Sequence, residues 1–156
     1  MKKYLSIMLL LIAVVFVSCG DDKDEPKPQV QTMNTAFLKG KAFQSSTGGT
    51  YVFQNNGKAV EFTVKEASKV LSLYLTFDSY EVTEENYYTY LNLKRTSSDG
   101  IVLTPKIKIY IKDLVTYKSI AMTTVVAGTE YETVYNYIGT ADEVMNKYSS
   151  YTKDEI

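Results

Sequence analysis

Four carboxylates lie close together in the middle of the chain, and carboxylates are side chains with which many hydrolases donate and accept protons. They are Asp78, Glu81, Glu84 and Glu85. A pair of such groups at a fixed separation can hydrolyse glycosides, and several together can bind calcium. Their spacing matches no calcium loop, and we expect an acidic turn around Glu81 to Asn86. The stretch therefore predicts neither a catalytic site nor a metal site.

The chain contains no histidine, which narrows the chemistry open to it. Histidine is the usual general base near neutral pH and the commonest zinc ligand. Without it, neither a Ser-His-Asp nor a Cys-His mechanism can operate. Ser-Lys chemistry remains open, but no motif supports it. The composition therefore favours a protein that is not an enzyme and that uses no cofactor.

Tyrosine is heavily used, with 14 in the chain. Two predicted strands carry tyrosines at alternate positions, which form our candidate face for a ligand or partner: Tyr88, Tyr90, Tyr131, Tyr135 and Tyr137. Such rows can stack on sugar rings or line a ligand cavity. They also stabilise sheets, since cross-strand aromatic pairs contribute ~0.2–1 kcal/mol each. Both interpretations stay open.

Three lysines, Lys106, Lys108 and Lys112, share one face of another predicted strand. They could meet an anionic glycan or a lipid headgroup. Alternatively, they are solvated side chains that protect a sheet edge from aggregation. The net charge of −1 provides no general basic surface, so we expect no nucleic-acid partner.

The only cysteine, Cys19, directly follows an apolar segment that begins after Lys2 and Lys3. That segment is shorter than the ~20 residues of a spanning helix, and its order of charge, apolar core and small residues is typical of a cleaved signal peptide. Phe16-Val17-Ser18-Cys19 resembles the lipobox of bacterial lipoproteins, with Val17 where leucine is more usual. The resemblance implies that residues 1–18 are removed and that Cys19 is lipidated. The alternative is a free thiol in a secreted protein.

Residues 19–33 are expected to form a flexible tether after the lipid. The run from Asp21 to Pro28 is too charged and proline-rich to bury apolar surface. It resembles the acidic signal that directs some Gram-negative lipoproteins to the outer face of the outer membrane, and it also suits a plain solvated spacer. The resemblance implies a lipid-anchored protein of the cell outer membrane, exposed at the surface.

Residues 34–156 are expected to form a single all-β domain of about eight antiparallel strands, closed as a barrel or stacked as a sandwich. Thr35 to Ser45 is the first predicted strand, and Asn56-Gly57 predicts a type I′ hairpin. Val70 to Phe77 alternates, with Leu71, Leu73, Leu75 and Phe77 on one face. The strand after Pro105 places Ile107, Ile109 and Ile111 on one face. Thr140 and Glu143 form a capping box that predicts a short C-terminal helix of about three turns.

The segments AFLKGKAF and TYVFQNNGKAVEF, between Ala36 and Val64, resemble the opening of lipocalin-like bacterial lipoproteins. Ala42 stands where that family has tryptophan. The resemblance implies an eight-stranded barrel with a C-terminal helix and an apolar cavity. The resemblance names no ligand. The signal, the strand count and the missing catalytic residues together favour a membrane-anchored, non-enzymatic binding module, and a cavity would hold a small hydrophobic or amphipathic ligand. A cavity of that kind would be lined by Val60, Phe62, Leu71 and Leu73. The alternative is an interaction lipoprotein that docks to another cell-envelope protein.

Overall fold

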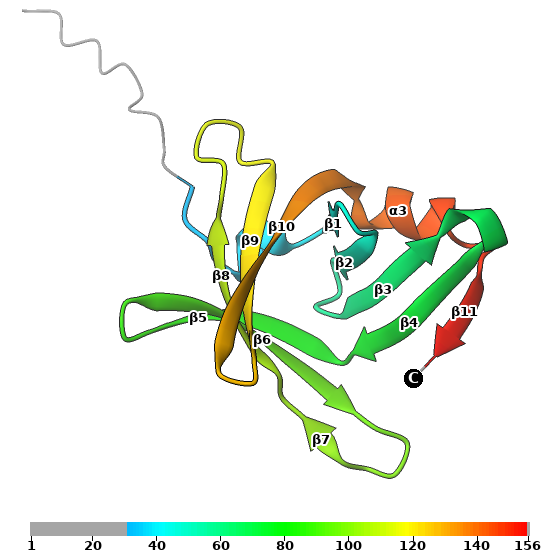
Figure 1. Cartoon of the computed structure of the whole chain (residues 1–156), viewed down its shortest axis with the longest axis horizontal. Coiled ribbons are helices and arrows are strands. Elements are labelled where there is room, and N and C mark those ends of the chain that lie inside the picture. Colours follow the sequence, from blue (N-terminus) through cyan, green and yellow to red (C-terminus); the bar gives the residue numbers. More distant parts are fainter. Residues whose placement is uncertain (1–30, 156) are drawn as a thin grey trace, which may run out of the picture. The chain divides into compact units, whose positions relative to one another are not determined.

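The computed structural model describes residues 31–155, which belong to the unit Gln31–Ile156. The predicted signal peptide, Cys19 and most of the tether lie outside the described residues. The fold is all-β, as predicted, with one continuous, strongly curved sheet (Figure 1). In chain order the elements are α2 (Thr35–Leu38), β1 (Lys41–Ser45), β2 (Gly49–Phe53), β3 (Ala59–Lys65), η1 (Glu66–Ser68), β4 (Val70–Phe77), β5 (Ser79–Glu85), β6 (Tyr88–Thr96), β7 (Val102–Leu103), β8 (Lys106–Ile111), β9 (Ser119–Val126), β10 (Thr129–Thr140), α3 (Ala141–Lys147) and β11 (Thr152–Glu155).

The sheet has eleven strands and is not closed. Its order is β11-β4-β3-β2-β1-β10-β9-β8-β6-β5, and β7 pairs with β6 off this path. Only β11, beside β4, pairs in parallel; all other neighbours are antiparallel. The two ends of the order, β11 and β5, are not paired with each other. The predicted count of about eight strands was therefore too low.

One missed strand is β5, which the sequence led us to expect as an acidic turn. Glu81, Glu84 and Glu85 lie instead along β5, which pairs with β6 over its whole length. The turn itself is Asn86-Tyr87, and both residues have positive φ. Two consecutive positive φ values are typical of a type I′ hairpin. The turn predicted for Asn56-Gly57 differs, since only Gly57 has positive φ there.

The predicted alternation in β4 is broken by a bulge at Leu73. This residue has a φ of 54° and is 56 % exposed. Its strand register with β3 shifts at the same place. An extra residue in one strand reverses the faces of those that follow. Leu71 and Phe77 therefore lie on opposite sides of the sheet, in two different cores.

The concave side of the sheet holds the larger of the two cores, which we call the main core. Among its fully buried members are Leu38, Phe43, Phe53, Leu91, Ile109 and Ile120. The predicted inward face of β8 is confirmed, because Ile107, Ile109 and Ile111 all belong to this core. Phe37 of α2 packs on Phe43 with ring centroids 6.5 Å apart. The segment expected as the first strand thus begins as a helical turn that covers part of the core.

The second core lies on the opposite side of β2, β3 and β4, under α3, and we call it the helix core. Its members include Ala42, Val52, Val60, Phe62, Leu71, Val144 and Tyr148. The capping box is confirmed: Thr140 Oγ1 accepts from the Glu143 amide, and the Thr140 amide donates to Glu143 Oε2 at 2.8 Å. The helix is shorter than predicted. After Lys147 the chain turns and enters the sheet as β11.

The expected ligand cavity is therefore not formed by the residues named for it. Val60, Phe62 and Leu71 pack against α3 in the helix core, and Leu73 points to solvent. The physical reason is that β3 is covered on both sides. Its even-numbered residues meet the helix, while Ala59 meets the main core.

Candidate functional site

The outward face of β8 carries the three lysines of the predicted basic stripe. Because Ile107, Ile109 and Ile111 point into the main core, Lys106, Lys108 and Lys112 must point away from it. Tyrosines of β6 and β8 and glutamates of β5 and β10 lie beside them, and β10 reaches this surface across β9. We call this surface the outer face and define it by Glu85, Tyr88, Tyr90, Lys106, Lys108, Tyr110, Lys112, Glu130 and Glu132.

Each lysine of the outer face lies over a tyrosine ring. Lys106 Nζ is 4.3 Å from the centroid of Tyr90, and Lys108 Nζ is 4.4 Å from that of Tyr88. Lys112 Nζ lies 5.6 Å from the centroid of Tyr110. A cation over an aromatic face is attracted by the ring's negative quadrupole. These contacts favour one arrangement of each lysine and its tyrosine on the sheet.

Each lysine is also paired with a carboxylate from another strand. Lys106 pairs with Glu85, Lys108 with Glu130 at 3.1 Å, and Lys112 with Glu132 at 2.8 Å. The hydrogen bond to Glu130 raises the pKa of Lys108. The hydrogen bond from Lys112 lowers the pKa of Glu132, and the Tyr110 hydroxyl acts in the same direction. The stripe that the sequence presents as basic therefore has its charge balanced locally.

An open groove of about 550 Å³ runs over this part of the molecule. Its lining comes from β6, β8, β9, β10 and the connection before β8: Tyr90, Pro105, Lys106, Ile107, Lys108, Thr123, Thr124, Val125 and Glu130. The groove therefore offers aromatic surface, hydroxyl groups and both signs of charge within one site. Binding sites typically combine apolar walls with a small number of fixed polar groups in this way.

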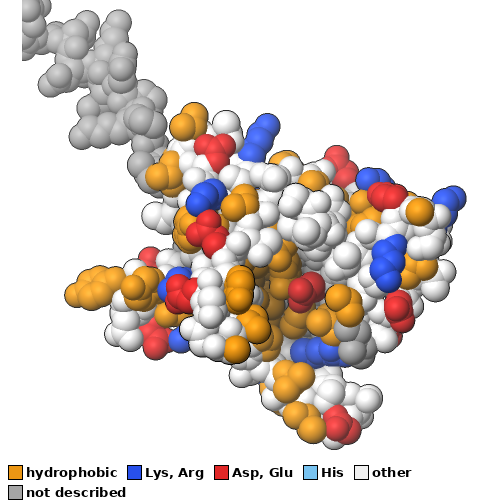
Figure 2. All heavy atoms as spheres, in the orientation of Figure 1, with side chains coloured by type: hydrophobic (Ala, Val, Ile, Leu, Met, Phe, Trp, Pro, Cys, Tyr) orange, Lys and Arg blue, Asp and Glu red, His pale blue; other side chains and the backbone are white. Residues whose placement is uncertain are grey.

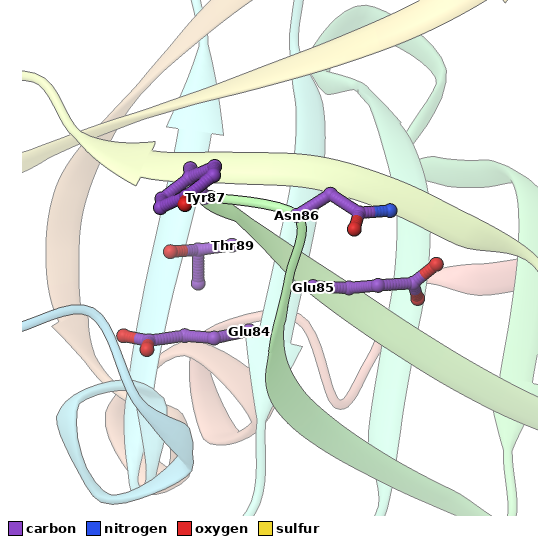
Figure 3. A pocket seen from close by; sticks show the side chains of 5 residues that line it. All are labelled: Glu84, Glu85, Asn86, Tyr87 and Thr89. Atoms are coloured by element: carbon purple, nitrogen blue, oxygen red, sulfur yellow. The ribbon is translucent and has the colours of Figure 1, made fainter.

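A second, smaller hollow of about 310 Å³ lies at the tip of the β5–β6 hairpin (Figure 3). The side chains of Glu84, Tyr87 and Thr89 lie on one side of the hairpin, and those of Glu85 and Asn86 on the other. Tyr87 is fully exposed. Figure 2 shows hydrophobic side chains projecting at this left-hand end of the molecule. The tip of the hairpin therefore continues the exposed surface of β5 and β6.

The four carboxylates of the predicted acidic turn are not brought together. Glu84 and Glu85 point to opposite sides of the hairpin (Figure 3). Asp78 lies at the other end of β5, where Thr96 donates its amide to Asp78 Oδ2 at 2.8 Å. Hydrogen bonds from Thr96 lower the pKa of Asp78. Within residues 31–155, no three Cys, Asp or Glu side chains are grouped so that they could hold a metal ion.

The five candidate tyrosines do not form one face. Tyr88 and Tyr90 lie on the outer face, with ring centroids 6.5 Å apart. Tyr135 and Tyr137 point inward instead and pack against the main core. Tyr131 shares their side of β10 but is 54 % exposed. Of the five tyrosines, two therefore lie on the outer face and two pack against the main core. The fifth lies on the opposite side of the sheet from the outer face and is exposed.

An interior acid, Glu61, was not among the residues that the sequence singled out for chemistry. It is the register partner of Tyr51 and faces the main core beside Tyr51 and Leu75. Burial raises the pKa of Glu61, while a hydrogen bond from Tyr51 opposes this shift. Burial and the nearby Glu61 carboxylate raise the pKa values of Tyr51 and Tyr135. The only signal in the sequence was an acid between Val60 and Phe62.

Replacing Glu61 by glutamine should make the domain more stable at neutral pH. The folded-state pKa of Glu61 lies above its unfolded value, so the folded state binds more protons between the two values. Stability therefore falls as pH rises through that window. Glutamine keeps the shape and a hydrogen-bond acceptor but carries no charge to desolvate. We expect the melting temperature of Glu61→Gln to exceed that of the wild type by a few degrees above neutral pH. The difference should shrink in acid; a pH-independent difference would contradict the assignment.

Comparisons of the chain with protein-family models, with curated proteins and with solved structures found no match. Among the described residues, no helix combines the length and the apolar character needed to cross a membrane.

Proposed function

We propose that this chain is a membrane-anchored surface lipoprotein that acts as a non-enzymatic binding module. We further propose that its curved sheet is an incomplete, lipocalin-like barrel and that its ligand binds on the outer face, not inside. The observation that carries this proposal is the 550 Å³ groove beside the lysine-tyrosine contacts. The groove joins four strands, so an extended ligand laid across them would touch each.

The close packing of the interior favours a ligand site on the outer face. Phe43 meets Phe53 and Tyr137 with ring centroids 6.3 and 6.0 Å away, and Phe53 meets Tyr80 at 5.1 Å. Aromatic rings at these spacings are in packing contact. The residues expected to line a ligand cavity pack instead against α3 or point to solvent. The packing of the interior therefore favours a ligand that binds on the surface over a small apolar ligand that binds inside.

Footprinting of the protein in its native envelope would test the proposal. Hydroxyl radicals would be applied to intact cells and, separately, to the full chain extracted in detergent. We expect Tyr88 and Tyr110 to be less reactive on cells, since these residues, 52 % and 37 % exposed, would be covered by the ligand.

Tyr131 is the matched control for Tyr88, because it is 54 % exposed but lies on the side of β10 that faces away from the outer face. Equal reactivity of Tyr88 and Tyr110 in both preparations would refute an occupied outer face. Native mass spectrometry that found a small molecule retained by the extracted chain would favour the interior instead.

A second candidate function, docking to another cell-envelope protein, is favoured by exposed apolar side chains in the connection between β8 and β9. Leu114 and Val115 are adjacent there and are 62 % and 86 % exposed. Exposed apolar groups that lie together often mark protein contacts. In the footprinting experiment this function predicts protection of Leu114 and Val115 with no change at Tyr88.

A further inference from the structure

The outer face presents fixed aromatic rings whose neighbouring charges cancel, and this combination restricts the kind of ligand it can bind. We propose that the outer face binds an uncharged polysaccharide chain; this inference rests on the proposed function and adds the ligand class to it. The structural basis is the one-to-one pairing of Lys106, Lys108 and Lys112 with Glu85, Glu130 and Glu132.

Charge balance argues against an anionic ligand. A phosphate, sulfate or carboxylate that approached Lys108 or Lys112 would also meet the glutamate that already holds that lysine. Attraction and repulsion at such similar distances largely cancel. Figure 2 shows the same arrangement more widely, since positive and negative side chains alternate over the visible surface without a large area of one sign. A cationic polymer attracted by a glutamate would likewise be repelled by the lysine paired with that glutamate.

The remaining chemistry suits the two kinds of surface that a sugar ring has. The C–H faces of a sugar are apolar and can lie on the parts of Tyr88 and Tyr110 that their lysines leave exposed, since a tyrosine ring is an amphipathic platform. Its hydroxyl groups can donate to Glu130 and accept from Lys108 or from the Thr123 hydroxyl, all of which border the groove or the rings. Charged groups make stronger hydrogen bonds to neutral ligands than neutral groups do.

The contacts among these groups also restrict their side chains before a ligand arrives. Tyr90 contacts Lys106 and Tyr88 contacts Lys108. Each of these lysines is in turn paired with a glutamate, Glu85 or Glu130. Side chains that are already ordered lose less conformational entropy on binding. This matters for a sugar polymer, because each sugar unit makes only a few weak contacts and affinity accumulates along the chain.

Binding of the full chain to a panel of polysaccharides would test this inference. The lipidated protein would be kept in a polyoxyethylene detergent, which carries no sugar, and titrated with fluorescently labelled neutral polymers (dextran, mannan, arabinoxylan and mixed-linkage glucan) and anionic ones (dextran sulfate and alginate). We expect at least one neutral polymer to bind and the anionic ones not to bind. Affinity for the neutral polymer should be nearly independent of NaCl concentration, because no ion pairs with the ligand form.

Variants of the outer face identify the site. Tyr88→Ala should weaken binding about tenfold, since the loss of one aromatic platform removes an interaction of that order. Tyr131→Ala removes an equally exposed tyrosine outside the face and should leave affinity unchanged. Circular dichroism would confirm that both variants are folded.

Two outcomes would overturn the inference: no binding to any neutral polymer of the panel, or binding only to the anionic ones with strong salt dependence. If either occurred while footprinting still showed Tyr88 and Tyr110 protected on cells, the outer face would be a binding site for a different ligand. The proposed function would then stand and the ligand class would be wrong.

Discussion

Replacing Phe43 by alanine is expected to lower the free energy of unfolding by about 3–5 kcal/mol, the usual cost of removing a buried phenylalanine. Phe43 is completely buried in the main core. Its ring contacts three other aromatic rings, which come from α2, β2 and β10. Truncation would leave a cavity at the point where three separate parts of the chain meet. A loss of this size is a large share of the ~5–15 kcal/mol that stabilises a typical domain.

Urea denaturation of wild type and Phe43→Ala would measure this loss as a shift in midpoint at similar slope. Tyr131→Ala is the control, since it removes an aromatic side chain that is 54 % exposed and should change stability by less than about 1 kcal/mol. Phe43→Leu, which retains most of the volume, should fall between the two. Equal stability of Phe43→Ala and Tyr131→Ala would mean that the aromatic packing of the main core does not support the fold as described.

Replacing Cys19 by alanine is expected to abolish lipid labelling and to release the protein from membranes. Cys19 lies outside the described residues, so this expectation rests on the resemblance of Phe16-Val17-Ser18-Cys19 to a lipobox. Each buried methylene group of an acyl chain contributes ~0.8 kcal/mol to membrane binding, and several chains together hold a protein firmly. Without the acyl chains, the variant would lose this contribution to membrane binding.

Growth with radiolabelled palmitate followed by membrane fractionation would show the result. The control replaces Asp21, Asp22, Asp24 and Glu25 by alanine. It should keep the label, because it leaves the lipobox intact, and protease access to intact cells would show whether these acids direct surface exposure. Persistent labelling of Cys19→Ala would refute the assignment of Cys19 as the lipidated residue of a lipobox.

Features that depend on neighbours along the chain were predicted well. The alternation of Ile107, Ile109 and Ile111 placed one face of β8 in the core, since side chains of a strand alternate whatever lies beside it. The capping box at Thr140 was equally local, because its two hydrogen bonds join residues three apart. Pro105, which has no amide to donate to a ladder, lies between β7 and β8.

Features that depend on a single backbone torsion were missed. The bulge at Leu73 requires positive φ at a leucine, a conformation that period-two alternation cannot reveal. The turn at Asn86-Tyr87 lacks the glycine that usually marks a type I′ hairpin. Without that signal, the glutamates before it indicated a turn and not the edge strand β5.

The candidate site shows the same division between local pattern and distant contact. The sequence identified Tyr88, Tyr90 and the three lysines as surface residues of interest. It could not show that Glu85 and Glu130, each more than twenty residues from its lysine, neutralise that stripe. Nor could it show that Tyr135 and Tyr137 point inward, away from Tyr88 and Tyr90. Side-chain period sets which residues share a face of one strand, but strand order decides which faces meet.

The sequence by itself determined the all-β class, the inward face of β8, the capped helix and the absence of histidine chemistry, because each follows from composition or from residues a few positions apart. Only the tertiary structure decided that the sheet stays open, that both sides of β3 are covered, and that the lysine stripe carries no net charge. Those properties arise from pairing between distant strands, and the energy of such contacts depends on partners that no local pattern specifies.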